Sequence, residues 1–238
     1  MSASALFQAG RLSETVDALA AQLRSNPLDA HSRTFLFELL CFTGEYDRAD
    51  IHLEALAGAS AEAGLGAWLY RAALHAERTR QGMFRAGAVP PPPAPQPPVA
   101  AAVNGRAVAA LADADPRIGA RLEVFAAGEY MLIPFDRLAS IRIEPPGRLR
   151  DLIWAPAVLQ PAPAYQGLEL GEVLLPVLAP LSWQHPDDQV RLGHVTDWEE
   201  DALGNAHPVG QKLLLLDEDE EIPFLELRTI EISPAQAG

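Results

Sequence analysis

The chain has 238 residues, of which 49% are hydrophobic, and a formal net charge of -14. This length and apolar content suffice for two compact domains with buried cores. Most of the negative charge follows residue 90, which disfavours nucleic acid as a partner because phosphates bind Lys and Arg. No apolar run is long enough to cross a membrane, and the N-terminus lacks the pattern of a secretion signal. We therefore expect a cytoplasmic protein, and its single cysteine, Cys41, excludes an internal disulfide.

Two similar segments lie 34 residues apart near the N-terminus. Gly10-Arg11-Leu12 and Gly44-Glu45-Tyr46 each place a small and a polar residue before an apolar one, at the start of a predicted helix. A period of about 34 residues is typical of tetratricopeptide helix pairs. Asp29, after the first unit, is expected to cap the next helix. The pattern predicts a tetratricopeptide-like helical stack over residues 1–86, with an ordinary helical bundle as the alternative.

Apolar residues recur at steps of three or four along the predicted helices, as one buried face requires. The helix predicted from about residue 30 to 43 is apolar on nearly all sides, so we expect it to be buried on several faces. A further helix is predicted from about residue 65 to 81. The stripes are Leu12, Val16, Leu19 and Leu23 in the first unit and Tyr46, Ala49, Leu53 and Leu56 in the second.

Residues 87–102 form a proline-rich linker. Proline-rich segments favour the extended polyproline II conformation and act as semi-rigid spacers. We expect this one to separate the helical stack from the rest of the chain. Recognition by an SH3-type domain is the alternative interpretation.

Residues 103–238 are predicted to form a mostly β, acidic domain. Short apolar or alternating segments bounded by Gly, Pro and acidic turns indicate strands. Seven short strands over about 120 residues favour a small antiparallel barrel or sandwich over a parallel sheet. The overall fold class is therefore α+β. The acidic run 217–221 is interpreted as a solvated hairpin turn, and a bulge is expected near Thr229. The strands are predicted over 121–125, 130–134, 139–144, 152–159, 168–178, 212–216 and 224–232, with a strand or helix over 103–111.

The usual catalytic and nucleotide-binding fingerprints are missing, and we expect no cofactor. The densest polar segment runs from His185 to Asp201 between Trp183 and Trp198. We interpret it as a structured loop in which an aspartate binds backbone amides and Arg191 pairs with a carboxylate. The alternative is a metal-dependent hydrolase, because histidines with interposed carboxylates can bind a divalent metal. Its ligands would be His185, Asp187, Asp188 and His194.

Several segments together carry a family resemblance. They are residues 6–12, 26–27, 33–41 and 44–49 in the helical part and 148–154, 174–178, 191–193, 196–198 and 225–228 in the β part. Through them the chain resembles, over nearly its whole length, the ImpE/TagJ (SciE-type) accessory proteins encoded with bacterial type VI secretion systems.

The resemblance implies a non-enzymatic adaptor that binds the small sheath subunit through a helix near that subunit's N-terminus. It also implies a role in recruiting the ATPase that recycles contracted sheath. A helical stack presents a groove in which an amphipathic helix can lie, and a general scaffold for another partner remains the alternative. The residues expected in the core are Phe35, Phe37, Leu39 and Leu40. The candidates for lining the groove are Arg33, Glu38, Tyr46, Trp68 and Arg71.

Overall fold

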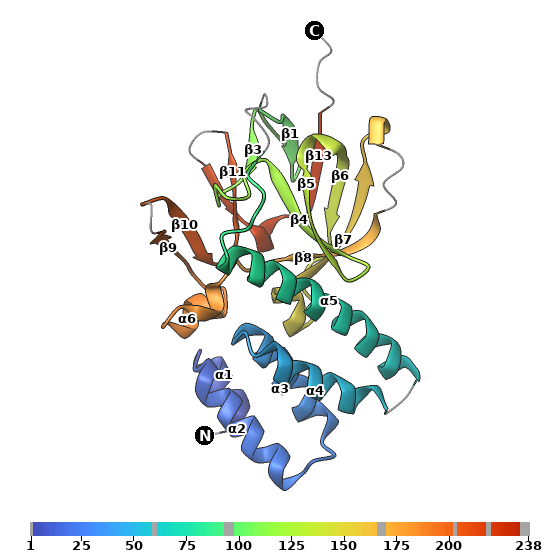
Figure 1. Ribbon diagram of the computed structural model, residues 1–238, viewed down its shortest axis with the longest axis vertical. Coiled ribbons are helices and arrows are strands. Elements are labelled where there is room, and N and C mark those ends of the chain that lie inside the picture. Colours follow the sequence, from blue (N-terminus) through green and yellow to red (C-terminus); the bar gives the residue numbers. More distant parts are fainter. Residues whose placement is uncertain are drawn as a thin grey trace.

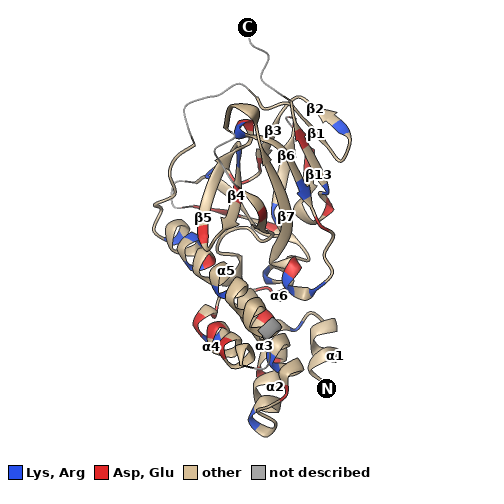
Figure 2. Cartoon of the chain, turned by 90° about the vertical axis from the view of Figure 1, so that its right-hand side faces the viewer, with Lys and Arg blue, Asp and Glu red and all other residues tan. Residues whose placement is uncertain are grey.

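Five helices form the N-terminal part of the computed structural model, and antiparallel sheets form the rest (Figure 1). The structure describes residues 2–58, 61–92, 98–165, 170–201, 204–217 and 220–233. Two views show α5 between the other helices and the sheets (Figure 1 and Figure 2). The chain is therefore α+β, as predicted. The helices are α1 (Ala3–Gln8), α2 (Leu12–Ser25), α3 (Ala30–Phe42), α4 (Tyr46–Ala57) and α5 (Ala61–Arg85).

The 34-residue repeat corresponds to two helix ends with the same geometry. Gly10 and Gly44 both adopt left-handed backbone, with φ of +70° and +71°. The residue after each glycine donates its N–H to a carbonyl five residues earlier, as from Glu45 to Leu40 at 2.9 Å. This Schellman-type helix end favours glycine, which has no Cβ to clash. The repeat therefore marks the ends of α1 and α3.

The predicted apolar stripes explain how the helices pack. The whole first stripe is buried in α2, whereas in α4 only Ala49 and Leu53 are fully buried. α3 is buried on several sides, as its composition predicted. The Asp29 carboxylate accepts a hydrogen bond from the backbone N–H of Ser32 at 3.1 Å, which confirms the predicted cap. Of the predicted core residues, Phe37, Leu39 and Leu40 are buried, and Phe35 is half-buried.

The strands belong to three antiparallel sheets in the described part of the chain. An eight-stranded sheet has the order β2-β1-β13-β6-β7-β8-β4-β5, and β12-β11-β3 and β10-β9 form smaller sheets. Of the predicted barrel or sandwich, the barrel is wrong, because β2 and β5 remain separate edges of the large sheet and it does not close. Side chains of the two larger sheets share one apolar core. The strands are β1 (Ala101–Val103), β2 (Arg106–Val108), β3 (Leu111–Asp113), β4 (Arg121–Ala126), β5 (Glu129–Pro134), β6 (Leu138–Ile143), β7 (Trp154–Pro161), β8 (Gly171–Pro176), β9 (Thr196–Glu200), β10 (Ala206–Gly210), β11 (Leu213–Leu216), β12 (Glu220–Pro223) and β13 (Thr229–Ile232).

The C-terminal segment differs from the single bulged strand predicted over 224–232. A 3₁₀ turn occupies Phe224–Glu226, and β13 begins only at Thr229. The backbone N–H of Leu227 bonds to the carbonyl of Phe224 at 3.1 Å, and both side chains are buried. In a continuous strand these two residues, three positions apart, would lie on opposite faces. The turn instead places both of them in the core. The strands β9, β10 and β12 lie outside the predicted segments.

The helices pack directly on the β part, so the predicted spatial separation is wrong. Phe125, Trp154 and Leu174 belong to the same apolar cluster as the buried residues of α2 to α5. Residues 88–92 and 98–100 of the predicted proline-rich spacer have no regular secondary structure, residues 101–102 already belong to β1, and residues 93–97 lie outside the described residues. The domain boundaries at residues 86 and 102 stay a prediction. Among the described helices, none has the length and apolar character needed to cross a membrane.

We predict that Gly44→Ala lowers the free energy of unfolding by more than about 2 kcal/mol. A Cβ at this position would clash with the Trp183 ring, and the left-handed backbone adds a penalty of about 1–2 kcal/mol. Gly66→Ala is the matched control, because its Cβ would meet nothing within 4 Å inside α5. The control should gain up to about 1 kcal/mol. Urea unfolding of both variants measures this, and equal stabilities would contradict the packing described.

Candidate partner-binding groove

An apolar groove of about 460 Å³ lies between the first half of α5 and the large sheet. Trp68, Leu69 and Ala72 of α5 line one side, and Val158 and Leu174 line the other. Trp68 is 66% exposed and Leu69 is 44% exposed. Large apolar side chains clustered at a concave surface are typical of interaction sites.

The strand pattern of β7 explains why the groove has an apolar floor. Alternate residues of a strand point to opposite faces of the sheet. Ala157 and the residues two positions before and after it are buried in the core of the β part. Trp154, Pro156 and Val158 therefore lie on the face toward α5. Trp154 is buried among the helices, whereas Pro156 and Val158 are only half-buried. The helix thus covers one end of this face and leaves the other open.

The tight turn between β4 and β5 forms another part of the lining. Ala127 and Gly128 have φ of +51° and +85°, and they connect the paired residues Ala126 and Glu129. Positive φ at both central residues is characteristic of a type I′ hairpin turn. A Cβ at Gly128 would lie 3.5 Å from the Cβ of Ala72, so the turn approaches α5 at a small side chain.

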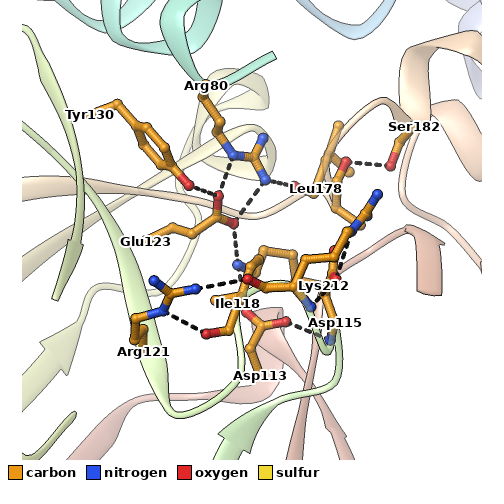
Figure 3. Close-up of polar contacts among 12 residues, drawn as sticks. Arg80, Asp113, Asp115, Ile118, Arg121, Glu123, Tyr130, Leu178, Ser182 and Lys212 are labelled. Carbon is orange, nitrogen blue, oxygen red and sulfur yellow. Dashed lines mark hydrogen bonds and ion pairs between the residues drawn. The ribbon is translucent and has the colours of Figure 1, made fainter. Parts of the chain in front are cut away.

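A buried ion pair anchors the second half of α5 to the sheet (Figure 3). The Arg80 guanidinium donates to both carboxylate oxygens of Glu123 on β4, at 2.7 and 2.9 Å. The Tyr130 hydroxyl donates to the same carboxylate at 2.8 Å. The Lys212 ammonium also contacts Glu123 and reaches Asp113 at 2.7 Å. Two cations and two carboxylates are therefore buried together, and Arg80 also pairs with a third buried carboxylate, Glu77.

A second set of contacts connects this cluster to β7. The Glu77 carboxylate accepts hydrogen bonds from Arg80 at 3.0 Å and from the Trp154 indole at 2.9 Å. Trp154 is itself 1% exposed and stacks on Tyr70 of α5. The turn of α5 that carries Glu77 and Arg80 is thus fixed to both β4 and β7. The groove begins where these contacts end.

Burial and the neighbouring cations shift the pKa values of Asp113 and Glu123 in opposite directions. Burial raises the pKa of Asp113 to about 6, although Lys212 opposes the shift. Burial would also raise the pKa of Glu123, but Arg80 and Lys212 hold it at about 2. Because Glu123 faces two cations, it remains ionised at pH values well below the usual pKa of a glutamate.

Only one of the five residues predicted to line a groove does so. Trp68 is in the lining, whereas Arg71 on the next turn of α5 forms an ion pair with Asp50 of α4 at 2.7 Å. The Arg33 guanidinium bonds to the carbonyl of Pro27. These arginines therefore connect helical segments to one another. Neither arginine is in the groove lining.

Of the other two predicted residues, Glu38 is buried and Tyr46 is half-buried. Glu38 forms an ion pair with Arg150 at 3.1 Å, and burial raises its pKa while Arg150 opposes the shift. Burial also raises the pKa of Tyr46 well above its usual value. Tyr46 contributes to a cavity of only about 20 Å³, roughly the space of one water. Glu38 thus joins α3 to the β part, and Tyr46 lines the cavity together with residues of both parts.

The polar segment from His185 to Asp201 is a structured region, as the preferred interpretation predicted. Asp187 caps the short helix α6 (Asp188–Arg191) by accepting from the backbone N–H of Gln189 at 2.8 Å. Asp188 accepts from the backbone N–H of Ser13 at 3.2 Å and pairs with Arg191 at 2.9 Å.

The same segment offers little support for the metal-dependent alternative. His185 lies 3.5 Å from Asp197, and His194 contacts the Gln189 amide at 2.9 Å. Asp187 and Asp188 use their carboxylates to hold backbone amides, so the four proposed ligands do not converge. Within the described ranges, no group of three or more His, Cys, Asp or Glu side chains is arranged to hold a metal ion.

Comparisons with known proteins give consistent results. The family model described as ImpE protein matches residues 105–231. A Pseudomonas aeruginosa protein named type VI secretion system accessory component TagJ is 34% identical over 271 residues, covering 100% of this chain and 93% of that protein. The crystal structure of protein VPA1032 from Vibrio parahaemolyticus superposes with a TM-score of 0.82 over 97% of both chains. At 20% identity, this last match shows a shared fold.

We predict that Glu123→Gln removes part of the protein's sensitivity to acid. The pKa of Glu123 is about 2 in the folded chain and near 4.5 when unfolded. Its contribution to stability is therefore complete above pH 4.5 and is lost as the pH falls toward 2. Between pH 5 and pH 3 the wild type should lose about 2 kcal/mol that the variant does not lose. Urea unfolding at both pH values measures this difference.

Asp113 contributes in the opposite direction, and the substitution reduces this contribution as well because Glu123 raises the pKa of Asp113, so the figure of about 2 kcal/mol refers to the Glu123 contribution alone. The pKa of Asp113 is higher in the folded chain, so Asp113 increases stability as the pH falls from about 6 toward 3.8. Glu199→Gln is the matched control, because Glu199 is exposed on β9. The control should keep the acid sensitivity of the wild type. If Glu123→Gln keeps the wild-type acid sensitivity too, that sensitivity does not come from the Arg80–Glu123 pair.

Proposed function

The chain belongs to the ImpE family, and we propose that it is a cytoplasmic, non-enzymatic adaptor that binds the small sheath subunit of a type VI secretion machine. The name of the P. aeruginosa relative supports an accessory role in that machine. The proposal needs no cofactor, nucleic acid or membrane. The ATPase that recycles contracted sheath would be engaged indirectly, through the sheath subunit.

The observation that carries the proposal is the groove between α5 and the sheet. An α-helix with its side chains is about 10–12 Å across, and helices commonly bind by laying an apolar face into such a groove. Trp68 and Leu69 are exposed at one side, and Val158 and Leu174 form the other. We infer that the N-terminal helix of the sheath subunit lies here.

In this proposal the first four helices support the binding site and do not form it. We interpret α1 to α4 as a short tetratricopeptide-like stack that braces α5 from the side opposite the sheet. The apolar cluster shared by the helices and β part supports this interpretation, since it joins Leu40, Leu74 and Trp154. The groove then requires both parts of the chain, in contrast to a groove within the helical stack alone.

We predict that Trp68→Ala weakens binding of a peptide with the sequence of the sheath subunit's N-terminal helix by roughly 30-fold. Buried aromatic anchors at interfaces typically contribute about 2 kcal/mol or more. Isothermal titration calorimetry with the full chain measures the affinity, which we expect in the range of tens of micromolar or tighter. Circular dichroism should show an unchanged fold, because Trp68 is mostly exposed.

Ile51→Ala provides the matched control for this experiment. Ile51 is also a large exposed side chain, 64% exposed on α4, but it does not line the groove. Its loss should change the affinity by less than about twofold. Equal weakening by both substitutions would place the site elsewhere, and no binding by the wild type would contradict the adaptor proposal.

A further inference from the structure

Two carboxylates lie on the sheet side of the otherwise apolar groove. Glu144 follows β6 and Glu172 belongs to β8, and both contribute to the lining. Both residues are exposed. Neither carboxylate has a hydrogen bond or ion pair with another of the residues that the structure describes. Their charges are therefore available to a partner in the groove.

The register of the sheet places these carboxylates diagonally across β7. The backbone N–H of Glu144 bonds to the carbonyl of Pro156 at 3.0 Å, and Glu172 pairs with Val158. Two strand spacings and a two-residue offset separate their Cα atoms by about 12 Å. Two turns of an α-helix advance about 10.5 Å over seven residues. One helix lying on Pro156 and Val158 therefore passes near both carboxylates.

One positively charged side chain, that of Arg142, lies on the same face of the sheet as the two carboxylates. Arg142 of β6 pairs with Val158 and lies two residues before Glu144, so alternation places it on the groove side of the sheet. It is exposed and is not part of the lining. Arg142 offsets some of the field of Glu144, whereas Glu172 lies two strands away. The lining itself contains two carboxylates and no cation.

We propose that Glu144 and Glu172 determine which helix the groove accepts. The preferred ligand is an amphipathic helix whose apolar face is flanked by Lys or Arg residues about seven positions apart. A helix with acidic residues at those positions is rejected, because like charges at the rim of an interface repel. Glu172 contributes more than Glu144, since Arg142 lies beside the latter. This inference rests on the proposed function and specifies its partner's charge.

The test uses the full chain and two synthetic helical peptides. Both carry the apolar positions of the sheath subunit's N-terminal helix, but one has Lys and the other Glu at two flanking positions seven residues apart. Calorimetry at low salt should show the Lys peptide binding roughly tenfold more tightly. The difference should shrink as salt is raised, because these charges are exposed.

Charge reversal of the protein provides the second arm. Glu172→Lys should remove or invert the preference for the Lys peptide, and Glu144→Lys should reduce it less. Glu199→Lys is the matched control, because it makes the same charge change on the separate β9–β10 sheet. Both Glu172 and Glu199 are exposed, and circular dichroism checks that each variant is folded. The control should keep the wild-type preference.

The outcomes separate this inference from the proposed function. Equal affinity of the wild type for both peptides, with Trp68→Ala still weakening both, would overturn charge selection and leave the adaptor proposal intact. If Glu172→Lys and Glu199→Lys changed the peptide preference equally, charge selection would be overturned as well, because only the net charge of the protein would then matter. Binding of neither peptide to the wild type would overturn both proposals.

Discussion

The ion pair between Arg80 and Glu123 is the interaction on which the arrangement of this protein depends. It is bidentate and almost completely buried, so separating α5 from the sheet would leave Arg80 paired with Glu77 alone and Glu123 with Lys212 and Tyr130 alone. Lys212 and Asp113 extend the pair into the adjoining three-stranded sheet. Such a pair fixes geometry more than it adds net stability. Its position in the second half of α5 holds that half on the sheet, and the groove opens beside the first half.

The helical and β parts consequently form one structural unit. The turn at Gly44 packs on Trp183, and α6 bonds to the start of α2 through Asp188 and Ser13. These contacts join the two ends of the helical repeat to the β part. A partner helix in the groove would contact α5 and the sheet together, so the affinity should depend on both parts. The exposed carboxylates Glu144 and Glu172 then add charge selectivity to an apolar site.

Local patterns predicted much of the fold. The three-to-four-residue stripe of α2, the cap at Asp29 and the glycine at each helix end depend on neighbouring residues, which the sequence displays directly. The groove could not be predicted in the same way, because Trp68 and Val158 meet only when α5 lies on the sheet. Glu38 and Tyr46 were predicted to line a groove, yet Glu38 pairs with Arg150 of the β part and Tyr46 lines a small cavity. β9 was missed because it is acidic and exposed along most of its length.

The central claim is that a helix from the sheath subunit binds between α5 and β7. The most direct measurement is a crystal structure of the full chain with the N-terminal peptide of that subunit. The account predicts a helical peptide whose apolar face contacts Trp68 and Val158 and whose flanking side chains lie near Glu172. A peptide bound on the surface of α1 to α4, or added as a strand to the edge at β5, would contradict it.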